Sequence, residues 1–332
     1  MGKVRWGIMG FGAFTDLRVG RAIMSSPDHE LVAIMSRNIN KAKKYAKKYS
    51  AQYYYDSAQN LVSNPDINAV YIVTPNYQHC KYTCMAAEKG LHVLCEKPMA
   101  MNLREAQRMV TLCRQNNVKL MIGNMMRFHS CHQWAKDCVK KGLLGEITVV
   151  RAKFEFYCSP EPTQWRFVPE LSGGGAIMDV GIHCIDLLRY LVEKEVTQVS
   201  AFVNTRSYSF PIDVTSQILM KFDNGILGTV NVSFDNKYPV NGFEICGIEG
   251  SLVGEGSIGQ KSTGKVTLIT SKGPEIYESK LTNPYVAEIE HFAECIEHNQ
   301  EPMINGEEGI KDLKICLAAY QSSRKNETID IS

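Results

Sequence analysis

The amino-acid sequence predicts an α/β protein with a doubly wound parallel sheet in its N-terminal domain and an α+β C-terminal domain whose sheet is mainly antiparallel. Short apolar runs alternate with longer amphipathic segments from Val4 to about Gly123, which is typical of a parallel sheet with helices on both faces. The rest of the chain carries runs rich in Val, Thr, Phe and Tyr, with a hairpin signal at Asp223-Asn224-Gly225. Because the period changes between them, we predict domains of residues 1–125 and 126–332.

Each expected element follows from its local pattern. In the first half, the predicted strands are residues 4–9, 31–35, 69–74, 92–95 and 119–122, and the predicted helices are residues 16–25, 39–48, 77–89 and 103–116. In the second half, helices are predicted over residues 179–191, 284–298 and 306–323, and strands over residues 198–204, 215–222, 228–234, 242–247 and 265–270. In a parallel sheet, ligands gather outside the carboxyl ends of the strands. The residues that follow each strand are therefore the candidates for a site.

Composition excludes several functional classes. The 37 basic and 35 acidic side chains give a formal net charge of +2, so no charge excess indicates a nucleic-acid or membrane surface. No stretch approaches the roughly 18–20 apolar residues of a membrane span. The first strand begins within a few residues of Met1, which leaves no room for a signal peptide. The eleven cysteines form no CxxC pair, so no metal site is indicated and reduced thiols in a cytoplasmic protein are expected.

A glycine-rich turn directly follows the first strand. It consists of Gly10, Phe11, Gly12, Ala13 and Phe14. Such a turn lets backbone N–H groups and a helix N-terminus meet the pyrophosphate of a dinucleotide. Thr15 stands where the dinucleotide fingerprint has its third glycine, and an ordinary strand–helix turn is the alternative interpretation.

The segment after the second predicted strand indicates which dinucleotide is preferred. An NAD-selective site usually has an acidic residue there to bind the ribose 2′-hydroxyl, and this chain has Ser36 and Arg37, with Lys41 one turn into the next helix. A hydroxyl and two cations suit a 2′-phosphate. We therefore expect NADP to be preferred, with NAD as the alternative. The neighbouring lysines 43, 44, 47 and 48 are interpreted as a solvated helix face.

Polar residues also follow the third strand in the predicted sheet. Thr74 and Asn76 flank Pro75, and His79 opens the next helix. At the carboxyl end of a strand these side chains could hydrogen-bond a cofactor, although a proline there is also a routine turn signal. His79 could equally be an exposed residue of the first helical turn.

Glu96, Lys97 and Pro98 follow the fourth predicted strand. Pro98 restricts the backbone and would hold Lys97 in the cleft at the strand end. A lysine in this position can polarise a substrate oxygen or give up a proton. The alternative is a surface lysine before a helix.

A triple glycine at residues 173–175 precedes a helix that carries Asp179 and His183. The two residues are four positions apart and share one helical face. A carboxylate beside an imidazole can orient it for general acid–base catalysis. The alternative is a buried core histidine whose hydrogen bonds are all made within the protein, near an aspartate that caps the helix. Asp186 and Arg189, on the same helix, could simply form an intrahelical ion pair.

Taken together, these motifs resemble the glucose–fructose oxidoreductase/inositol dehydrogenase (Gfo/Idh/MocA) family. Glu96-Lys97-Pro98 is similar to the family's EKP signature, and the Asp179–His183 spacing is similar to its catalytic helix. The resemblance covers essentially the whole chain. Within the family it is closest to the 1,5-anhydro-D-fructose reductase branch, through Arg5-Trp6-Gly7, Trp165-Arg166 and residues 242–252.

The resemblance implies a Rossmann domain, an open sheet domain often used for dimerisation, and a nicotinamide beside Lys97. The resemblance also implies further cofactor contacts, at Glu96, Lys97, Gly123 or Asn124, Trp165, Arg166 and Tyr285. We therefore expect a homodimer or higher homo-oligomer that reduces or oxidises a sugar, anhydro-sugar or polyol with NADP, using Lys97, Asp179 and His183. The alternatives are an NAD-retaining glycoside hydrolase of the same fold and a non-catalytic dinucleotide-binding regulator.

Overall fold

The computed structural model describes residues 4–26, 28–159, 161, 164–205 and 210–331. Within it the chain forms two compact units. The first unit runs to Asn124 and also takes in Tyr285–Ile310, and the second combines Met125–Pro284 with the residues from Lys311 onward. The predicted boundary at residue 125 lies one residue from the observed one. The predicted division into two contiguous domains does not account for Tyr285–Ile310. This segment packs into the core of the first unit although it follows most of the second unit in the sequence.

The first unit contains a six-stranded, all-parallel sheet in the order β3-β2-β1-β4-β5-β6. Its strands are β1 (Val4–Met9), β2 (His29–Met35), β3 (Tyr53–Tyr55), β4 (Ala69–Ile72), β5 (His92–Glu96) and β6 (Leu120–Gly123). The order reverses at β1, as in doubly wound sheets, and the crevice at this switch point is where ligands bind in such folds. The predicted parallel α/β architecture is confirmed.

Helices connect these strands. They are α1 (Ala13–Leu17), α2 (Val19–Met24), α3 (Ile39–Tyr49), α4 (Ala58–Val62), the 3₁₀ turn η1 (Asn76–Gln78), α5 (His79–Ala87) and α6 (Leu103–Gln115). The single helix expected over residues 16–25 is instead two short helices. A further helix, α10 (Pro284–Glu297), completes the core, because Phe292 packs on the fully buried Trp6 with 5.9 Å between ring centroids.

The second unit contains a nine-stranded sheet in the order β14-β13-β12-β11-β7-β10-β9-β8-β15. Among the described strand pairs of this sheet, only β7–β10 is parallel, which confirms a mainly antiparallel sheet. The strands are β7 (Ile147–Glu155), β8 (Val196–Asn204), β9 (Thr215–Phe222), β10 (Leu227–Ser233), β11 (Gly242–Gly247), β12 (Gly250–Glu255), β13 (Lys265–Thr270), β14 (Gly273–Glu278) and β15 (Ile329–Asp330).

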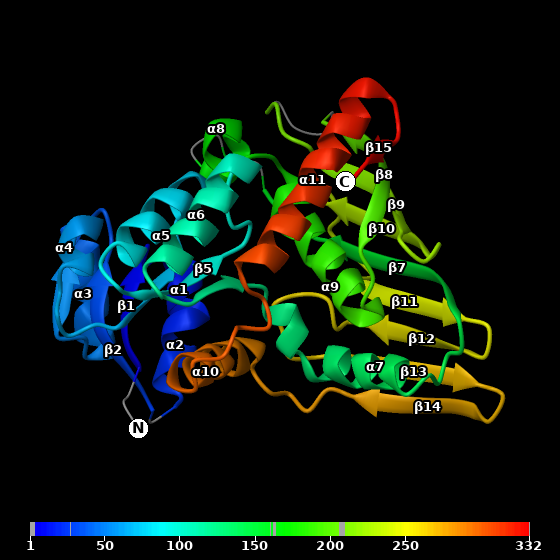
Figure 1. Cartoon of the computed structure of the whole chain (residues 1–332), viewed down its shortest axis with the longest axis horizontal. Coiled ribbons are helices and arrows are strands. Elements are labelled where there is room, and N and C mark those ends of the chain that lie inside the picture. The colour runs from blue at the N-terminus through cyan, green and yellow to red at the C-terminus, as the bar shows by residue number, and fades with distance from the viewer. Residues whose placement is uncertain (1–3, 27, 160, 162–163, 206–209, 332) are drawn as a thin grey trace. The chain divides into compact units, whose positions relative to one another are not determined.

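Helices α7 (Ser130–Lys140) and α9 (Ile182–Val192) pack against this sheet (Figure 1). The shorter turns are η2 (Met125–Phe128), η3 (Trp165–Phe167), α8 (Pro169–Ser172) and the π-helical segment η4 (Ile177–Gly181). Helix α11 (Gly306–Lys325) begins in the first unit and enters the second at Lys311. Along β9, buried and exposed side chains alternate. One face of the sheet is therefore packed and the other is open.

Helix α9 is the central helix of the second unit, with ten of its eleven residues buried. One helical stretch of the described chain, Pro169–Val192, is long and apolar enough to cross a membrane by length and composition. However, 78% of its apolar window is buried inside the protein, as expected for a core helix that is apolar on all sides.

Buried histidines make the fold sensitive to acid. The imidazole of His132 is fully buried and contacts the Met126 carbonyl oxygen at 2.8 Å and Ser257 Oγ at 3.2 Å. Burial lowers its pKa from 6.5 to about 3. The unfolded chain therefore binds a proton near pH 6.5 that the folded chain does not, and stability falls as the pH drops below 6.5.

We predict that His132 alone removes about 2 kcal/mol of unfolding free energy between pH 7.5 and pH 5. Urea denaturation at these two pH values, with wild type and His132→Asn, measures the effect. The variant keeps an amide N–H for the Met126 carbonyl but cannot titrate. Its loss of unfolding free energy between the two pH values should therefore be about 2 kcal/mol smaller than that of wild type. His298→Asn is the control, and an unchanged pH dependence in His132→Asn would contradict the prediction.

Candidate functional site

The glycine turn after β1 has the geometry that a dinucleotide requires. Gly10 has a φ of +95°, and a Cβ at that position would lie 2.4 Å from the Val73 carbonyl oxygen. Gly12, by contrast, has open space where a Cβ would stand. The turn is fixed because the N–H groups of Gly10 and Phe11 both donate to the Met35 carbonyl at 3.0 Å. The first glycine therefore shapes the turn, and the second leaves room for a ligand against the backbone.

Thr15 stands at the position of the third glycine, and its hydroxyl forms hydrogen bonds within the turn. The Thr15 side chain is buried, its Oγ1 donates to the Gly10 carbonyl at 3.0 Å, and it accepts from the Gly12 N–H at 3.4 Å. The departure from the fingerprint is thus compensated by two hydrogen bonds within the turn.

The two aromatic residues of the turn have different surroundings. Phe11 is buried against Tyr45, with ring centroids 4.6 Å apart, so only its backbone can reach a ligand. Phe14 is half-buried and meets the ring of Tyr285 edge-on at 6.0 Å. Tyr285 comes from α10. The structure therefore brings this expected cofactor contact to the glycine turn, although the two lie about 270 residues apart in the sequence.

The residues expected to select NADP lie together at the end of β2. Ser36 is buried, and its N–H donates to the Tyr55 carbonyl at 3.1 Å. Arg37 and Lys41 are both exposed. Asn38 lies between them and caps α3 by accepting from the Lys41 N–H at 3.1 Å. The two cations are available to a ligand.

At the end of β4, Thr74 and Pro75 form a turn that leads into η1. Within the described part of the chain, Thr74 Oγ1 is a buried hydroxyl without a hydrogen-bond partner, and Asn76 is buried. Such an orphaned polar atom is costly unless a ligand or water satisfies it. Together with the space beside Gly12, it shows that this edge of the sheet fits a dinucleotide.

His79 is fully buried, so the alternative of an exposed first-turn residue is wrong. Its Nδ1 lies 2.8 Å from the Pro98 carbonyl oxygen and its Nε2 lies 2.9 Å from the Thr74 carbonyl oxygen. Each ring nitrogen therefore faces a backbone carbonyl oxygen, and the single N–H of a neutral ring donates to one of the two. His79 can therefore affect a cofactor site only indirectly, by positioning the two turns that it contacts.

The EKP segment lies at the end of β5. Glu96 Oε1 accepts a hydrogen bond from the buried Tyr71 hydroxyl at 2.9 Å, and the Lys97–Pro98 peptide bond is cis. Lys97 itself is half-buried. Gly123 pairs with Glu96 in the sheet, and a Cβ there would lie 3.5 Å from the Glu96 backbone. The next residue, Asn124, is buried at the end of the first unit.

In the second unit, a tightly packed glycine turn precedes the helix that carries the expected acid–base pair. Gly174 has a φ of +155°, and a Cβ on Gly175 would collide with the Asp213 carbonyl oxygen. The Asp213 carboxylate accepts from the Gly175 N–H at 2.6 Å, the Ile177 N–H at 2.7 Å and the Tyr320 hydroxyl at 2.6 Å. Asp213 therefore caps this helix. The sequence analysis missed it, because it lies 34 residues after Asp179 in a segment without a motif.

Asp179 lies in the π-helical segment η4, a type of irregularity that is frequent at functional sites. Its carboxylate accepts a hydrogen bond from Arg166 Nε at 3.0 Å, and the Arg166 guanidinium lies 5.1 Å from the Trp165 ring centroid. His183 is 5% exposed, with the Phe154 ring at 6.1 Å. The structure thus joins Trp165 and Arg166 to Asp179. The orientation of His183 by Asp179 stays a prediction.

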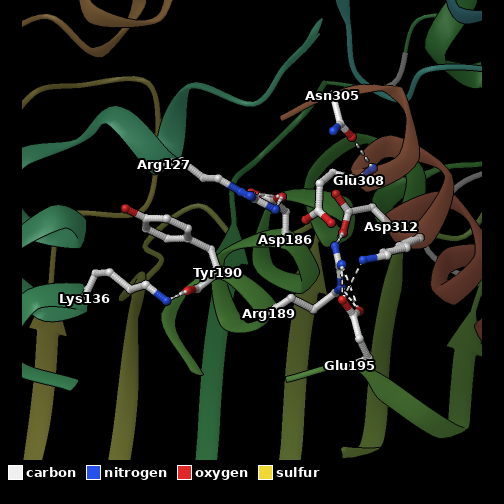
Figure 2. A network of polar contacts seen from close by, with 10 residues as sticks. Arg127, Lys136, Asp186, Arg189, Tyr190, Glu195, Asn305, Glu308 and Asp312 are labelled. Carbon is white, nitrogen blue, oxygen red and sulfur yellow. Dashed lines mark hydrogen bonds and ion pairs between the residues drawn. The ribbon is translucent and has the colours of Figure 1, made fainter. Parts of the chain in front are cut away.

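A buried ionic network holds α9 in place (Figure 2). Arg127 donates to both carboxylate oxygens of the fully buried Asp186, at 2.6–3.1 Å. Arg189 pairs with Asp312 at 2.6 Å and with Glu195 at 2.9 Å. The suggested intrahelical Asp186–Arg189 pair is therefore wrong, since each residue pairs with a partner outside α9.

These partners compensate charges that would otherwise be costly to bury. Removing one partner of such a pair leaves an unpaired charge in the interior, which costs about 3–5 kcal/mol. The network fixes α9 to η2 and α11. Among the described residues, no cluster of three or more His, Cys, Asp or Glu side chains could hold a metal ion.

The first unit therefore has strand ends that fit a dinucleotide, and the second unit carries the helix with the expected acid–base pair; a dinucleotide-dependent oxidoreductase needs both. Residues 4–124 match the oxidoreductase family with an NAD-binding Rossmann fold, and residues 132–253 match the GFO/IDH/MocA C-terminal domain. The chain belongs to the GFO/IDH/MocA oxidoreductase family.

Individual relatives agree with this assignment. The chain is 30% identical to 1,5-anhydro-D-fructose reductase of Ensifer adhaerens, with 98% of each chain covered. It is 27% identical to the NADP⁺-dependent D-xylose 1-dehydrogenase of Haloarcula marismortui over 98% of this chain and 92% of that one. The crystal structure of aldose-aldose oxidoreductase from Caulobacter crescentus, complexed with glycerol, is similar with a TM-score of 0.93 at 28% identity, covering 99% of this chain and all of that one.

Proposed function

We propose that the protein is an NADP-dependent oxidoreductase, similar to 1,5-anhydro-D-fructose reductase, that transfers hydride between the nicotinamide and a carbonyl or hydroxyl carbon of a sugar, anhydro-sugar or polyol. The observation that carries this proposal is the combination of Lys97 at a strand end of the dinucleotide-binding unit with Asp179 and His183 on the buried helix of the other unit. The named activities of the relatives support the substrate class.

The bound nicotinamide would supply or accept the hydride, and the protein would handle the proton and the charge. In the reductive direction His183 would protonate the developing alkoxide, with Asp179 holding the imidazole in position. The Lys97 ammonium would donate a hydrogen bond to the same oxygen and stabilise its negative charge. Arg166, which is already bonded to Asp179, would help to hold substrate or cofactor. In oxidation the proton moves in the opposite direction and His183 acts as the base.

The preference for NADP is proposed from the end of β2, where two exposed cations stand in place of an acidic residue. A guanidinium forms charge-assisted bonds with a 2′-phosphate that NADH does not possess. We predict that Arg37→Ala weakens NADPH binding by about 10- to 100-fold and NADH binding by less than about threefold.

Titration of each nucleotide by fluorescence measures both dissociation constants. Lys47→Ala, which removes an exposed cation from the same helix α3, is the matched control and should leave both constants unchanged. Equal losses of NADPH and NADH in Arg37→Ala would remove the case for NADP.

We further propose that a second copy of the chain covers the open face of the nine-stranded sheet. Strand register places five exposed apolar side chains on this face: Phe202, Leu219, Leu227, Ile269 and Ile276. Apolar surface of this kind is typical of interfaces between protein chains. Sedimentation equilibrium tests the proposal, because a dimer has twice the mass of the single chain. A cytoplasmic location is proposed from cysteine usage alone.

A further inference from the structure

The residues on both sides of Lys97 are held by buried side chains of the neighbouring β4–α5 segment. On one side, the Glu96 carboxylate accepts a hydrogen bond from Tyr71; on the other, the Pro98 carbonyl lies against His79. We propose that Tyr71 and His79 are positioning residues that fix the Glu96-Lys97-Pro98 turn and thereby set where Lys97 presents its ammonium group. This inference rests on the proposed function, in which Lys97 acts on the substrate oxygen.

His79 joins two strand ends. Its imidazole lies between the Pro98 carbonyl, after β5, and the Thr74 carbonyl, after β4, at 2.8 and 2.9 Å. A shorter side chain with one amide cannot span both contacts. Burial lowers the pKa of His79, and the two carbonyl contacts oppose that change. Because the ring has no exposed surface, its role is to keep the two turns in register.

Tyr71 holds the other side of the turn. Its side chain is fully buried in β4, and its hydroxyl lies 2.9 Å from Glu96 Oε1 and 3.3 Å from Glu288 Oε2. Burial and these two carboxylates raise the pKa of Tyr71 well above 10, so the phenol keeps its proton and acts as the donor. Glu288 is buried and belongs to α10. The hydroxyl therefore ties the glutamate before Lys97 to β4 and to the returning helix.

These contacts leave Lys97 between two anchored neighbours in the described structure. Catalytic groups must be held within a few tenths of an ångström of the productive geometry, and a misplacement of about 1 Å can cost about 100-fold in rate. A purely structural role for Tyr71 and His79 would instead lower stability without changing the chemistry of Lys97. The two possibilities differ in measurable ways.

The experiment compares Tyr71→Phe and His79→Asn with two matched controls. Tyr82→Phe removes the hydroxyl of a buried tyrosine in α5, and His92→Asn changes a histidine at the opposite end of β5. Five quantities are measured: the melting temperature, the NADPH dissociation constant, kcat and KM with a keto-sugar that wild type reduces, and the rate of Lys97 acetylation by acetic anhydride. Acetylation is followed by mass spectrometry and normalised to the exposed Lys89, so it needs no substrate.

For Tyr71→Phe we expect kcat to fall about 10-fold, and for His79→Asn about 30- to 100-fold, with NADPH affinity within about threefold of wild type. The rate of Lys97 acetylation relative to that of Lys89 should change in both variants and stay the same in both controls. Unchanged kcat and an unchanged acetylation rate in the two variants would overturn the inference. If wild type turns over none of the sugars tested, the proposed function fails instead, and the acetylation of Lys97 still tests whether Tyr71 and His79 position the lysine.

Discussion

Replacing Lys97 with alanine is expected to lower kcat by about 1000-fold while changing the NADPH dissociation constant by less than about threefold. The ammonium group is proposed to stabilise charge that develops only in the transition state, so its loss should not weaken ground-state binding. The glycine turn and the residues after β2, which are proposed to hold the nucleotide, remain unchanged in this variant.

Lys89→Ala is the matched control, because it removes an exposed lysine of the same unit. It should have near-normal kcat. Steady-state kinetics and fluorescence titration on both variants separate catalysis from binding. Near-normal turnover in Lys97→Ala would sink the role given to this residue, and a parallel loss of NADPH binding would reassign it to cofactor binding.

Replacing Asp213 with alanine is expected to lower the free energy of unfolding by about 3 kcal/mol. Its buried carboxylate accepts from the N–H groups of Gly175 and Ile177 and from the Tyr320 hydroxyl. Alanine would leave these three donors buried without an acceptor. Burial raises the pKa of Asp213, and the hydrogen bonds to the carboxylate oppose that change.

Urea denaturation measures the effect, with Asp223→Ala as the control because that aspartate lies exposed in the β9–β10 turn. Asp213→Asn keeps one acceptor oxygen and should lose about half as much stability as Asp213→Ala. An Asp213→Ala variant as stable as Asp223→Ala would show that the cap does not hold the start of the acid–base helix.

Features set by local sequence were predicted well. The limits of β1, the glycine turn and the strand-end position of Lys97 all follow from apolar periodicity interrupted by glycine or proline. Because all strands of a parallel sheet run in the same direction, these strand-end residues lie at the same edge of the sheet. Strand β7 was missed because Arg151, Lys153 and Glu155 point to the open face and make the segment look polar.

Features that depend on distant partners could not be predicted. Asp186 and Arg189 are three residues apart, yet their partners Arg127 and Asp312 lie 59 and 123 residues away. The return of α10 to the first unit depends in the same way on Phe292 packing against Trp6. His79 was open to interpretation as an exposed residue because helix position alone does not reveal that both ring nitrogens meet backbone carbonyls.

The most direct test of the central claim is nucleotide consumption by the wild-type protein over a panel of keto-sugars that includes 1,5-anhydro-D-fructose, with NADPH and NADH compared and Lys97→Ala as the blank. The account predicts substrate-dependent oxidation of NADPH, faster than that of NADH, which disappears in the variant. Absence of turnover with every member of the panel, and with the corresponding alcohols and NADP⁺, would contradict it. That result would favour a hydrolase that retains NAD or a regulator that only binds the dinucleotide.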